Sequence, residues 1–223
     1  NMVYVIGIII AYLLGSIPFG FLLAKWSGKG DVRKVGSGGT GATNVMRVGG
    51  FKLAALTWIL DMAKSIASVF IGYWLVGRDF GALCGLISVL GHCYPVWLKF
   101  KGGKGISSMY GIMLAINPLI FVVCGIEWLI VSLSTGYSSL AAVVAFLVLP
   151  LLGFPIGTNI GLVFVGITLL CLWRHRSNIQ RLLNGTESKI EWKWKNKFTK
   201  MCFLNRTSSA VFLLSMGFVF ILC

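Results

Sequence analysis

The sequence predicts an all-α polytopic integral membrane protein, a bundle of about seven transmembrane helices. Two properties of its composition support this fold class. Hydrophobic residues make up 57% of the chain and charged residues only 12%, which is typical of membrane proteins. The 20 basic and 6 acidic residues give a net charge of +14, and the cations lie between apolar runs. This spacing favours cytoplasmic loops over a nucleic-acid-binding surface, so no nucleic acid partner is expected.

The first half of the chain contains three apolar runs. Residues 2–24 are long enough to cross a bilayer, and no cation precedes them, so they are expected to form a membrane helix and not a signal peptide. Residues 25–52 carry six cations and one acid, which predicts a cytoplasmic loop and an external N-terminus. A second span is expected over about 51–76, and a third, 82–98, returns to the inner side.

A proline decides how many times the second half of the chain is expected to cross the membrane. Residues 106–134 would be about 43 Å long as one helix, more than a hydrocarbon core requires, and Asn117-Pro118 interrupts them. Segments 138–152 and 158–173 follow, and the latter ends in a basic exit that should be cytoplasmic. This orientation requires residues 106–134 to form two membrane segments and not one. The whole chain then crosses the membrane seven times. Four polar stretches then share one face: 36–47, 99–105, 135–139 and 174–187.

The tail differs from the rest. Residues 1–187 are expected to form one membrane-embedded domain, followed by a tail at 188–223. Within the tail, 192–197 is basic and aromatic, which suits the lipid headgroup region. Residues 210–223 are apolar but span only about 21 Å as a helix. They could be a partial eighth segment, a surface-lying helix or a truncated span, and we assign them no function.

Two glycine-rich loops are candidates for anion binding. Residues 36–44 hold four glycines and three hydroxyls before Arg47, and glycine lets backbone N–H groups approach an anion closely. Gly36, Gly38 and Gly41 fit a dinucleotide fingerprint, but no strand precedes them. An anion-binding loop is therefore favoured over a dinucleotide site or a plain flexible loop. Residues 99–105 repeat the pattern with three cations and three glycines.

The polar inventory fits a phosphorylated substrate with little covalent catalysis. The sequence shows no recognisable trio of a Ser or Cys nucleophile, a base and an orienting carboxylate. The six cysteines form no Cys-x-x-Cys pair and the two histidines lack clustered ligands, so no metal or cofactor is expected. Asp61 and Lys64 share one helical face at membrane depth. Both a structural ion pair and a polar wall behind the glycine loop remain open for them.

Six motifs in order carry a family resemblance. They are Gly15-Ser16-Ile17-Pro18, the loop 36–44, Asp61-x-x-Lys64, Gly91-His92-x-x-Pro95, Lys101-Gly102-Gly103-Lys104-Gly105, and His175-x-x-Asn178 continuing to Glu187. Over about residues 4–187 the chain resembles the bacterial acyl-phosphate:glycerol-3-phosphate acyltransferase family (PlsY). In that family Asn is usual where this chain has Gly39, and glycine is common where it has Ser65.

The resemblance implies a reaction and a location. The enzyme would transfer a fatty acyl group from acyl-phosphate to the 1-hydroxyl of sn-glycerol 3-phosphate, the first step of phospholipid synthesis, without a cofactor. It would be a multi-pass protein of the bacterial cytoplasmic membrane, in contact with membrane lipid. Its functional partner would be the separate soluble phosphate acyltransferase that makes acyl-phosphate.

The resemblance also implies residue roles. The residues expected to be catalytic are Ser37, Lys104, His175 and Asn178. Those expected to bind substrate are Gly36, Gly38, Gly41, Thr43, Asn44, Arg47, Gly102, Gly103, Ser139, Arg181 and Glu187. Lys104 and Arg47 are assigned to glycerol phosphate, the 37–44 loop to acyl-phosphate, and Ser139 to one phosphate. His175 and Asn178 would orient the attacking hydroxyl, and His92 is expected to be structural.

A transporter for an organic phosphate is the main rival. Broken helices and intramembrane charges also build transport sites. Such a protein should have polar sites near the bilayer midplane and often internal repeats, whereas here the polar residues gather towards one face and no repeat is visible.

Overall fold

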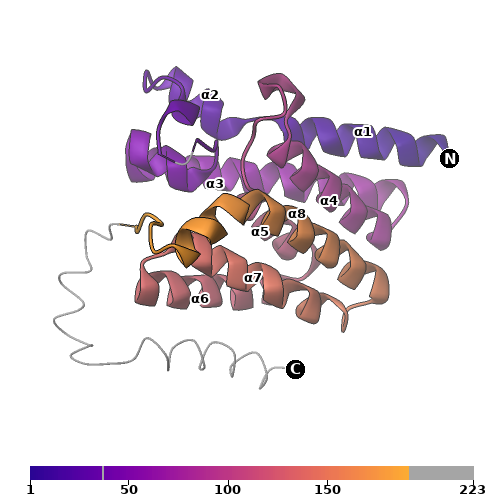
Figure 1. The fold of residues 1–223 in the computed structure, drawn as a ribbon. Coiled ribbons are helices and arrows are strands. Elements are labelled where there is room, and N and C mark those ends of the chain that lie inside the picture. The colour runs from indigo at the N-terminus through magenta and orange to yellow at the C-terminus, as the bar shows by residue number, and fades with distance from the viewer. Residues whose placement is uncertain (37, 191–223) are drawn as a thin grey trace.

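The computed structural model describes residues 1–36 and 38–190. The expectations for Ser37 and for tail residues 191–223 lie outside the described residues. All regular elements in the described part are helices, so the all-α prediction is confirmed (Figure 1). They are α1 (Met2–Ser16), α2 (Phe19–Trp26), the short 3₁₀ turn η1 (Val32–Lys34), α3 (Ala42–Leu75), α4 (Arg78–Cys93), the 3₁₀ turn η2 (Val96–Leu98), α5 (Ile106–Ile116), α6 (Pro118–Thr135), α7 (Ser138–Gly153) and α8 (Thr158–Leu183).

The apolar helices correspond to the seven expected segments. Five stretches of the described chain are long and apolar enough to cross a membrane: Met2–Trp26, Ala42–Leu75, Arg78–Leu98, Pro118–Thr135 and Thr158–Leu183. Two shorter apolar helices, α5 and α7, complete the set. The bundle is therefore that of a polytopic membrane protein.

Prolines break two of the apolar runs. At the expected site, α5 ends at Ile116 and α6 begins at Pro118, where the Asn117 side chain caps the new helix by accepting from the Leu119 N–H. This confirms the broken form of 106–134. The span predicted over 2–24 is present as Met2–Trp26, but it is not one continuous helix, because Ile17 is extended and Pro18, which lacks an N–H, separates α1 from α2.

Two helices extend further than expected towards the polar loops. α3 starts at Ala42, not near residue 51, and is kinked at Gly50, which has a φ of +80°. α8 continues to Leu183 instead of ending at 173. The polar stretch 174–187, predicted as a loop, therefore begins as nearly three further turns of helix.

The helices pack around a core shared by α3, α4, α5, α6, α7 and α8, with Ile112, Phe146 and Phe164 fully buried. α1 leaves apolar side chains such as Ile6 and Ile9 exposed on the outside, as a lipid-facing helix does. The beginning of α3 and the last turns of α8 lie at the same end of the bundle (Figure 1). That end carries the polar loops.

Candidate functional site

A cavity of about 780 Å³ opens where the four polar stretches meet. Its polar lining includes residues from each of them: Gly39, Gly41, Thr43, Asn44, Arg47, Gly103, Lys104, Ser138, Ser139, His175, Asn178 and Glu187. The predicted convergence of these stretches on one site is confirmed. The rest of the cavity is apolar and is lined by side chains of α3, α5 and α6, among them Trp58, Tyr110, Phe121 and Leu129.

Three helices begin at this cavity. The first turns of α3, α5 and α7 contribute Ala42 and Thr43, Ile106 and Ser107, and Ser138 and Ser139 to its wall. Within the described residues none of the three helix starts has a side-chain cap. First-turn N–H groups have no acceptor inside their own helix and carry the positive end of the helix dipole. Their convergence makes this end of the cavity attractive to anions.

A chain of hydrogen bonds links Lys104 to α8 and the segment after it. The Lys104 ammonium donates to Asn178 Oδ1 at 2.6 Å, and Asn178 Nδ2 donates to Glu187 Oε1 at 2.6 Å. The same carboxylate accepts from Ser139 Oγ at 2.9 Å and from Arg181 Nε at 2.7 Å. Both Glu187 oxygens are thus engaged by protein donors, so this residue organises the other four.

The charges of this network shift two pKa values. Burial, together with the nearby cations Arg181, Arg174 and Arg47, lowers the pKa of Lys104 to about 8, although Glu187 acts in the opposite direction. Burial alone would raise the pKa of Glu187, but the donors Asn178, Ser139 and Arg181 outweigh it and the pKa is lowered. Lys104 is therefore a cation and Glu187 an anion at neutral pH.

His175 lines the cavity and keeps one ring nitrogen as an acceptor. It lies on α8 three residues before Asn178, so both side chains share one helical face. Its Nδ1 is 2.8 Å from the carbonyl oxygen of Cys171, and a carbonyl only accepts, so Nδ1 carries the proton. Its ring packs edge-on against Phe146 and is 98% buried. In the neutral ring Nε2 is left with its lone pair.

The first glycine loop is held in shape by Asn44. The Nδ2 group lies 2.8 Å from the carbonyl of Val32, 3.0 Å from that of Val35 and 2.8 Å from that of Gly39. Gly36 has a φ of +59°, and a Cβ there would lie 2.4 Å from Asn44 Oδ1. Gly38 has a φ of +68°. Asn44 and these glycines therefore shape the loop, while Thr43 and Arg47 lie on the cavity wall.

The second glycine loop is pinned from both sides. Gly102 N–H donates to the Cys93 carbonyl at 3.2 Å and Gly103 N–H to the His92 carbonyl at 3.0 Å. Both glycine carbonyls accept from Arg174, each at 3.0 Å. Both N–H groups therefore already have acceptors at the end of α4, and a role of Gly102 and Gly103 in substrate binding stays a prediction. Lys104 is the side chain of this loop that reaches the network.

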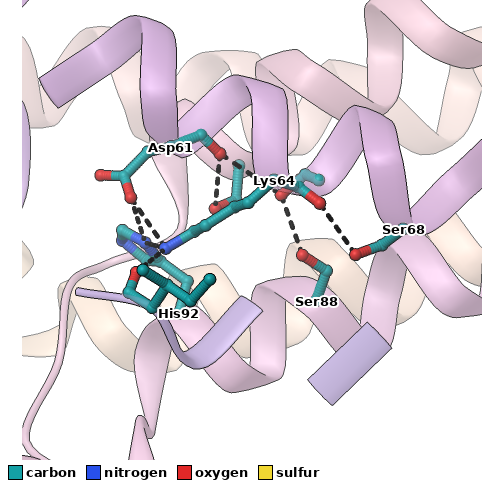
Figure 2. A network of polar contacts seen from close by, with 8 residues as sticks. Asp61, Lys64, Ser68, Ser88 and His92 are labelled. Carbon is teal, nitrogen blue, oxygen red and sulfur yellow. Dashed lines mark hydrogen bonds and ion pairs between the residues drawn. The ribbon is translucent and has the colours of Figure 1, made fainter. Parts of the chain in front are cut away.

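The intramembrane charges form an ion pair. Lys64 Nζ lies 2.7 Å from Asp61 Oδ1, and the side chains are only 2% and 1% exposed. Figure 2 shows the Lys64 amino group between Asp61 and His92, whose Nδ1 is 3.1 Å away. His92 also contributes to the cavity wall. The structural ion pair, one of the two readings left open, is therefore present.

Sequence reasoning missed two parts of the site. It assigned no residues to the apolar wall, because Trp58, Phe121 and Trp128 look like ordinary membrane-helix residues in the sequence. It counted Arg174 as one more cation and did not foresee its role as a clamp on the second loop. Among residues 1–36 and 38–190, no cluster of three His, Cys, Asp or Glu side chains could hold a metal ion.

Comparison with known proteins gives consistent matches. Residues 5–185 match the family described as glycerol-3-phosphate acyltransferase. A glycerol-3-phosphate acyltransferase of Rhizobium etli is 45% identical over 183 residues, which cover 82% of this chain and 89% of that protein. The crystal structure of PlsY (YgiH), an integral membrane glycerol 3-phosphate acyltransferase, in its glycerol 3-phosphate form superimposes with a TM-score of 0.80 at 39% identity, covering 84% of this chain and 95% of that one. Its lysophosphatidic acid form gives a TM-score of 0.79 at 37% identity, covering 87% and 98%.

Proposed function

The chain belongs to the glycerol-3-phosphate acyltransferase family, and from this premise we propose that its acyl donor is an acyl-phosphate. The reaction joins the fatty acyl carbon to the 1-hydroxyl oxygen of sn-glycerol 3-phosphate. The bond between that carbon and the donor's phosphate oxygen breaks. The products are 1-acyl-glycerol 3-phosphate and inorganic phosphate.

The observation that carries this proposal is the two-part cavity. Its polar end combines three helix starts with Arg47 and Lys104, enough positive potential for two phosphate groups. Its other end is apolar and can hold a hydrocarbon chain. An acyl-phosphate carries both features in one small molecule, with the phosphate directly on the reacting carbon.

The two phosphates are assigned to different parts of the polar end. Lys104 and Arg47 bind the phosphate of glycerol 3-phosphate, because both are cations on the cavity wall. The first turn of α3, with Thr43, binds the phosphate of the donor, and Ser37 of the preceding loop joins it. Ser139, at the start of α7, supports one of the two.

His175 and Asn178 orient the attacking hydroxyl. The free lone pair on His175 Nε2 accepts from that hydroxyl, and Asn178 keeps Lys104 in position. A mixed anhydride is already a good acylating agent, so orientation and charge neutralisation can supply the rate. The departing phosphate takes the hydroxyl proton, which makes a protein base unnecessary.

The polar end is assigned to the cytoplasmic face of a bacterial cell membrane. Exposed cations such as Lys25, Lys29, Lys99 and Lys101 belong to the two segments that carry the glycine loops, in agreement with the positive-inside rule. Acyl-phosphate made by a soluble phosphate acyltransferase would then reach the site from the same side. Labelling of a Lys101→Cys variant in intact cells tests this orientation, since a cytoplasmic thiol is protected from an impermeant reagent.

The donor is tested with purified protein in detergent and labelled glycerol 3-phosphate. We expect lysophosphatidate to form with palmitoyl-phosphate and not with palmitoyl-CoA or palmitoyl-acyl carrier protein. Lys104→Ala should abolish product formation. Lys101→Ala, an exposed lysine of the same loop, is the matched control and should retain it.

Two results would contradict the proposal. Turnover with palmitoyl-CoA or the carrier protein, and none with palmitoyl-phosphate, would assign a different donor. Flux of glycerol 3-phosphate into proteoliposomes without acylation would favour a transporter.

A further inference from the structure

Three sequence motifs that the proposed reaction does not use meet in one buried cluster. Asp61 and Lys64 come from α3, His92 lies in the last turn of α4, and Ile17 lies in the break between α1 and α2. Lys64 Nζ reaches all of the others: Asp61 Oδ1 at 2.7 Å, His92 Nδ1 at 3.1 Å and the Ile17 carbonyl at 2.8 Å. The cluster therefore ties three helical segments together at one point (Figure 2).

The contacts of Lys64 fix the orientation of the His92 ring. An ammonium has three N–H donors and no acceptor. Lys64 donates hydrogen bonds to the Ile17 carbonyl and to His92, and it forms an ion pair with Asp61. His92 Nδ1 must therefore accept from the Lys64 ammonium. Because a buried network of this kind has few alternative arrangements, the ring has one preferred direction.

The other edge of that ring lies against the loop that carries Lys104. A Cβ placed on Gly103 would lie 2.0 Å from His92 Nε2, so the ring touches the Gly103 backbone. The His92 carbonyl also accepts the Gly103 N–H. At Gly102 a Cβ would lie 2.3 Å from the His92 carbonyl oxygen and 2.4 Å from Pro95 Cδ. The two glycines are thus seated on the end of α4, directly before Lys104.

Stability alone gives a weak reason for a buried ion pair at this place. Replacing such a pair with apolar residues of similar size is often neutral or stabilising, since two charges must be taken out of water. Beyond stability, the Asp61–Lys64 pair fixes the orientation of the His92 ring against the loop of Gly102 and Gly103.

We propose that Asp61, Lys64 and His92 are positioning residues for Lys104, acting through the backbone of Gly102 and Gly103. The proposal rests on the assignment of Lys104 to the phosphate of glycerol 3-phosphate. The cluster supports the loop through the contact of His92 with Gly103. Arg174 holds the carbonyls of Gly102 and Gly103, and Asn178 orients the Lys104 ammonium. None of the three residues is itself assigned to a substrate, so loosening the cluster acts by moving Lys104 away from the phosphate.

Equilibrium binding of labelled glycerol 3-phosphate to the purified protein in detergent tests this. Binding needs no acyl donor, so the wrong choice of donor would leave the measurement intact. Two variants approach the cluster separately: the paired Asp61→Leu/Lys64→Met, and His92→Asn, which keeps an acceptor near Nδ1 but removes the ring tip beneath Gly103. Each should weaken binding about 10-fold. If one of the two variants does not fold, the other still tests the proposal.

The same variants in a Lys104→Ala background separate positioning from a general structural role. If the cluster acts through Lys104, neither variant should weaken binding further there, because Lys104→Ala has already removed what it positions. A further loss of about 10-fold in that background, or unchanged affinity of the variants with Lys104 present, would overturn the proposal. Glu127→Gln is the control: this acid is 93% buried on α6 but is absent from the cavity lining, and it should bind normally.

Discussion

The ammonium of Lys104 lies 2.6 Å from the side-chain oxygen of Asn178, although 74 positions separate the two residues in the chain. The Asn178 amide is itself held at its other end by Glu187. Lys104 is therefore aimed by a residue of α8 and supported by its own loop. A phosphate bound by this lysine depends on the geometry of both segments.

Removing the Asn178 amide should impair use of glycerol 3-phosphate. Asn178→Ala takes away one hydrogen bond to a cation and one to a carboxylate, and hydrogen bonds to charged groups contribute about 1.5–3 kcal/mol each. We expect kcat/KM for glycerol 3-phosphate to fall about 10- to 100-fold, measured by steady-state acylation. Ser177→Ala, an exposed neighbour on α8, should leave it unchanged. Equal losses in both would point to the helix end and not to the amide.

Activity should decline as the pH rises above the pKa of Lys104. Its pKa of about 8 means that the free enzyme loses this positive charge as the pH rises through that value. The phosphate of glycerol 3-phosphate is already a dianion there, with a second pKa near 6. We therefore expect kcat/KM for glycerol 3-phosphate, which reports the free enzyme, to be high below about pH 8 and to fall above it.

Arginine at position 104 should remove this alkaline decline. A guanidinium does not titrate in this range, so Lys104→Arg should give a flat profile, with lower activity because its geometry differs. Lys101→Arg, in the same loop but exposed, should keep the decline. Persistence of the decline in Lys104→Arg would assign it to another group among those facing the site, which include Arg47, Arg174, Arg181, His175 and Glu187.

Gly103 and His92 should be energetically coupled. Gly103→Ala places a methyl group where the His92 ring lies, so the loop must shift and acylation should drop strongly. In a His92→Ala background the same methyl group has room, and the additional loss should be much smaller. A double-mutant cycle on acylation rates measures this difference. Equal losses in both backgrounds would mean that the ring is not the obstacle.

Charge and proline patterns were sufficient to predict where the site lies. Arg174 and the cations of 25–52 oriented the segments, and Asn117-Pro118 supplied the break that brings 135–139 to the same end as the glycine loops. These features act locally, through the positive-inside rule and the missing N–H of proline, and can be read without a tertiary structure.

The use of each polar group could not be predicted in the same way. The amides of Gly102 and Gly103 resemble phosphate donors in the sequence, yet the last carbonyls of α4 accept them. Asn44 resembles a ligand-binding amide but its Nδ2 group faces three backbone carbonyls. Which acceptor a donor meets depends on how helices pack. That packing places His92 and Val32 next to loops that are distant in the sequence.

The apolar part of the cavity has an open position at Gly125 on α6. This residue lies on the cavity wall, and a Cβ added there would meet no atom within 4 Å. In the described structure, nearby wall residues include Phe121, Trp128 and Leu129. Space at Gly125 is therefore available to an acyl chain.

Filling that space should shift the enzyme towards shorter acyl donors. The series Gly125→Ala, Gly125→Val and Gly125→Leu adds volume stepwise at a position where the backbone is helical and tolerates a side chain. Relative rates with lauroyl-, myristoyl- and palmitoyl-phosphate should move progressively towards the shorter chains, while KM for glycerol 3-phosphate stays constant because the polar end is untouched. Ile130→Leu, on the same helix but absent from the cavity lining, should keep the original preference. An unchanged ranking with Gly125→Leu would place the acyl chain elsewhere, since a leucine at this position cannot share the space with it.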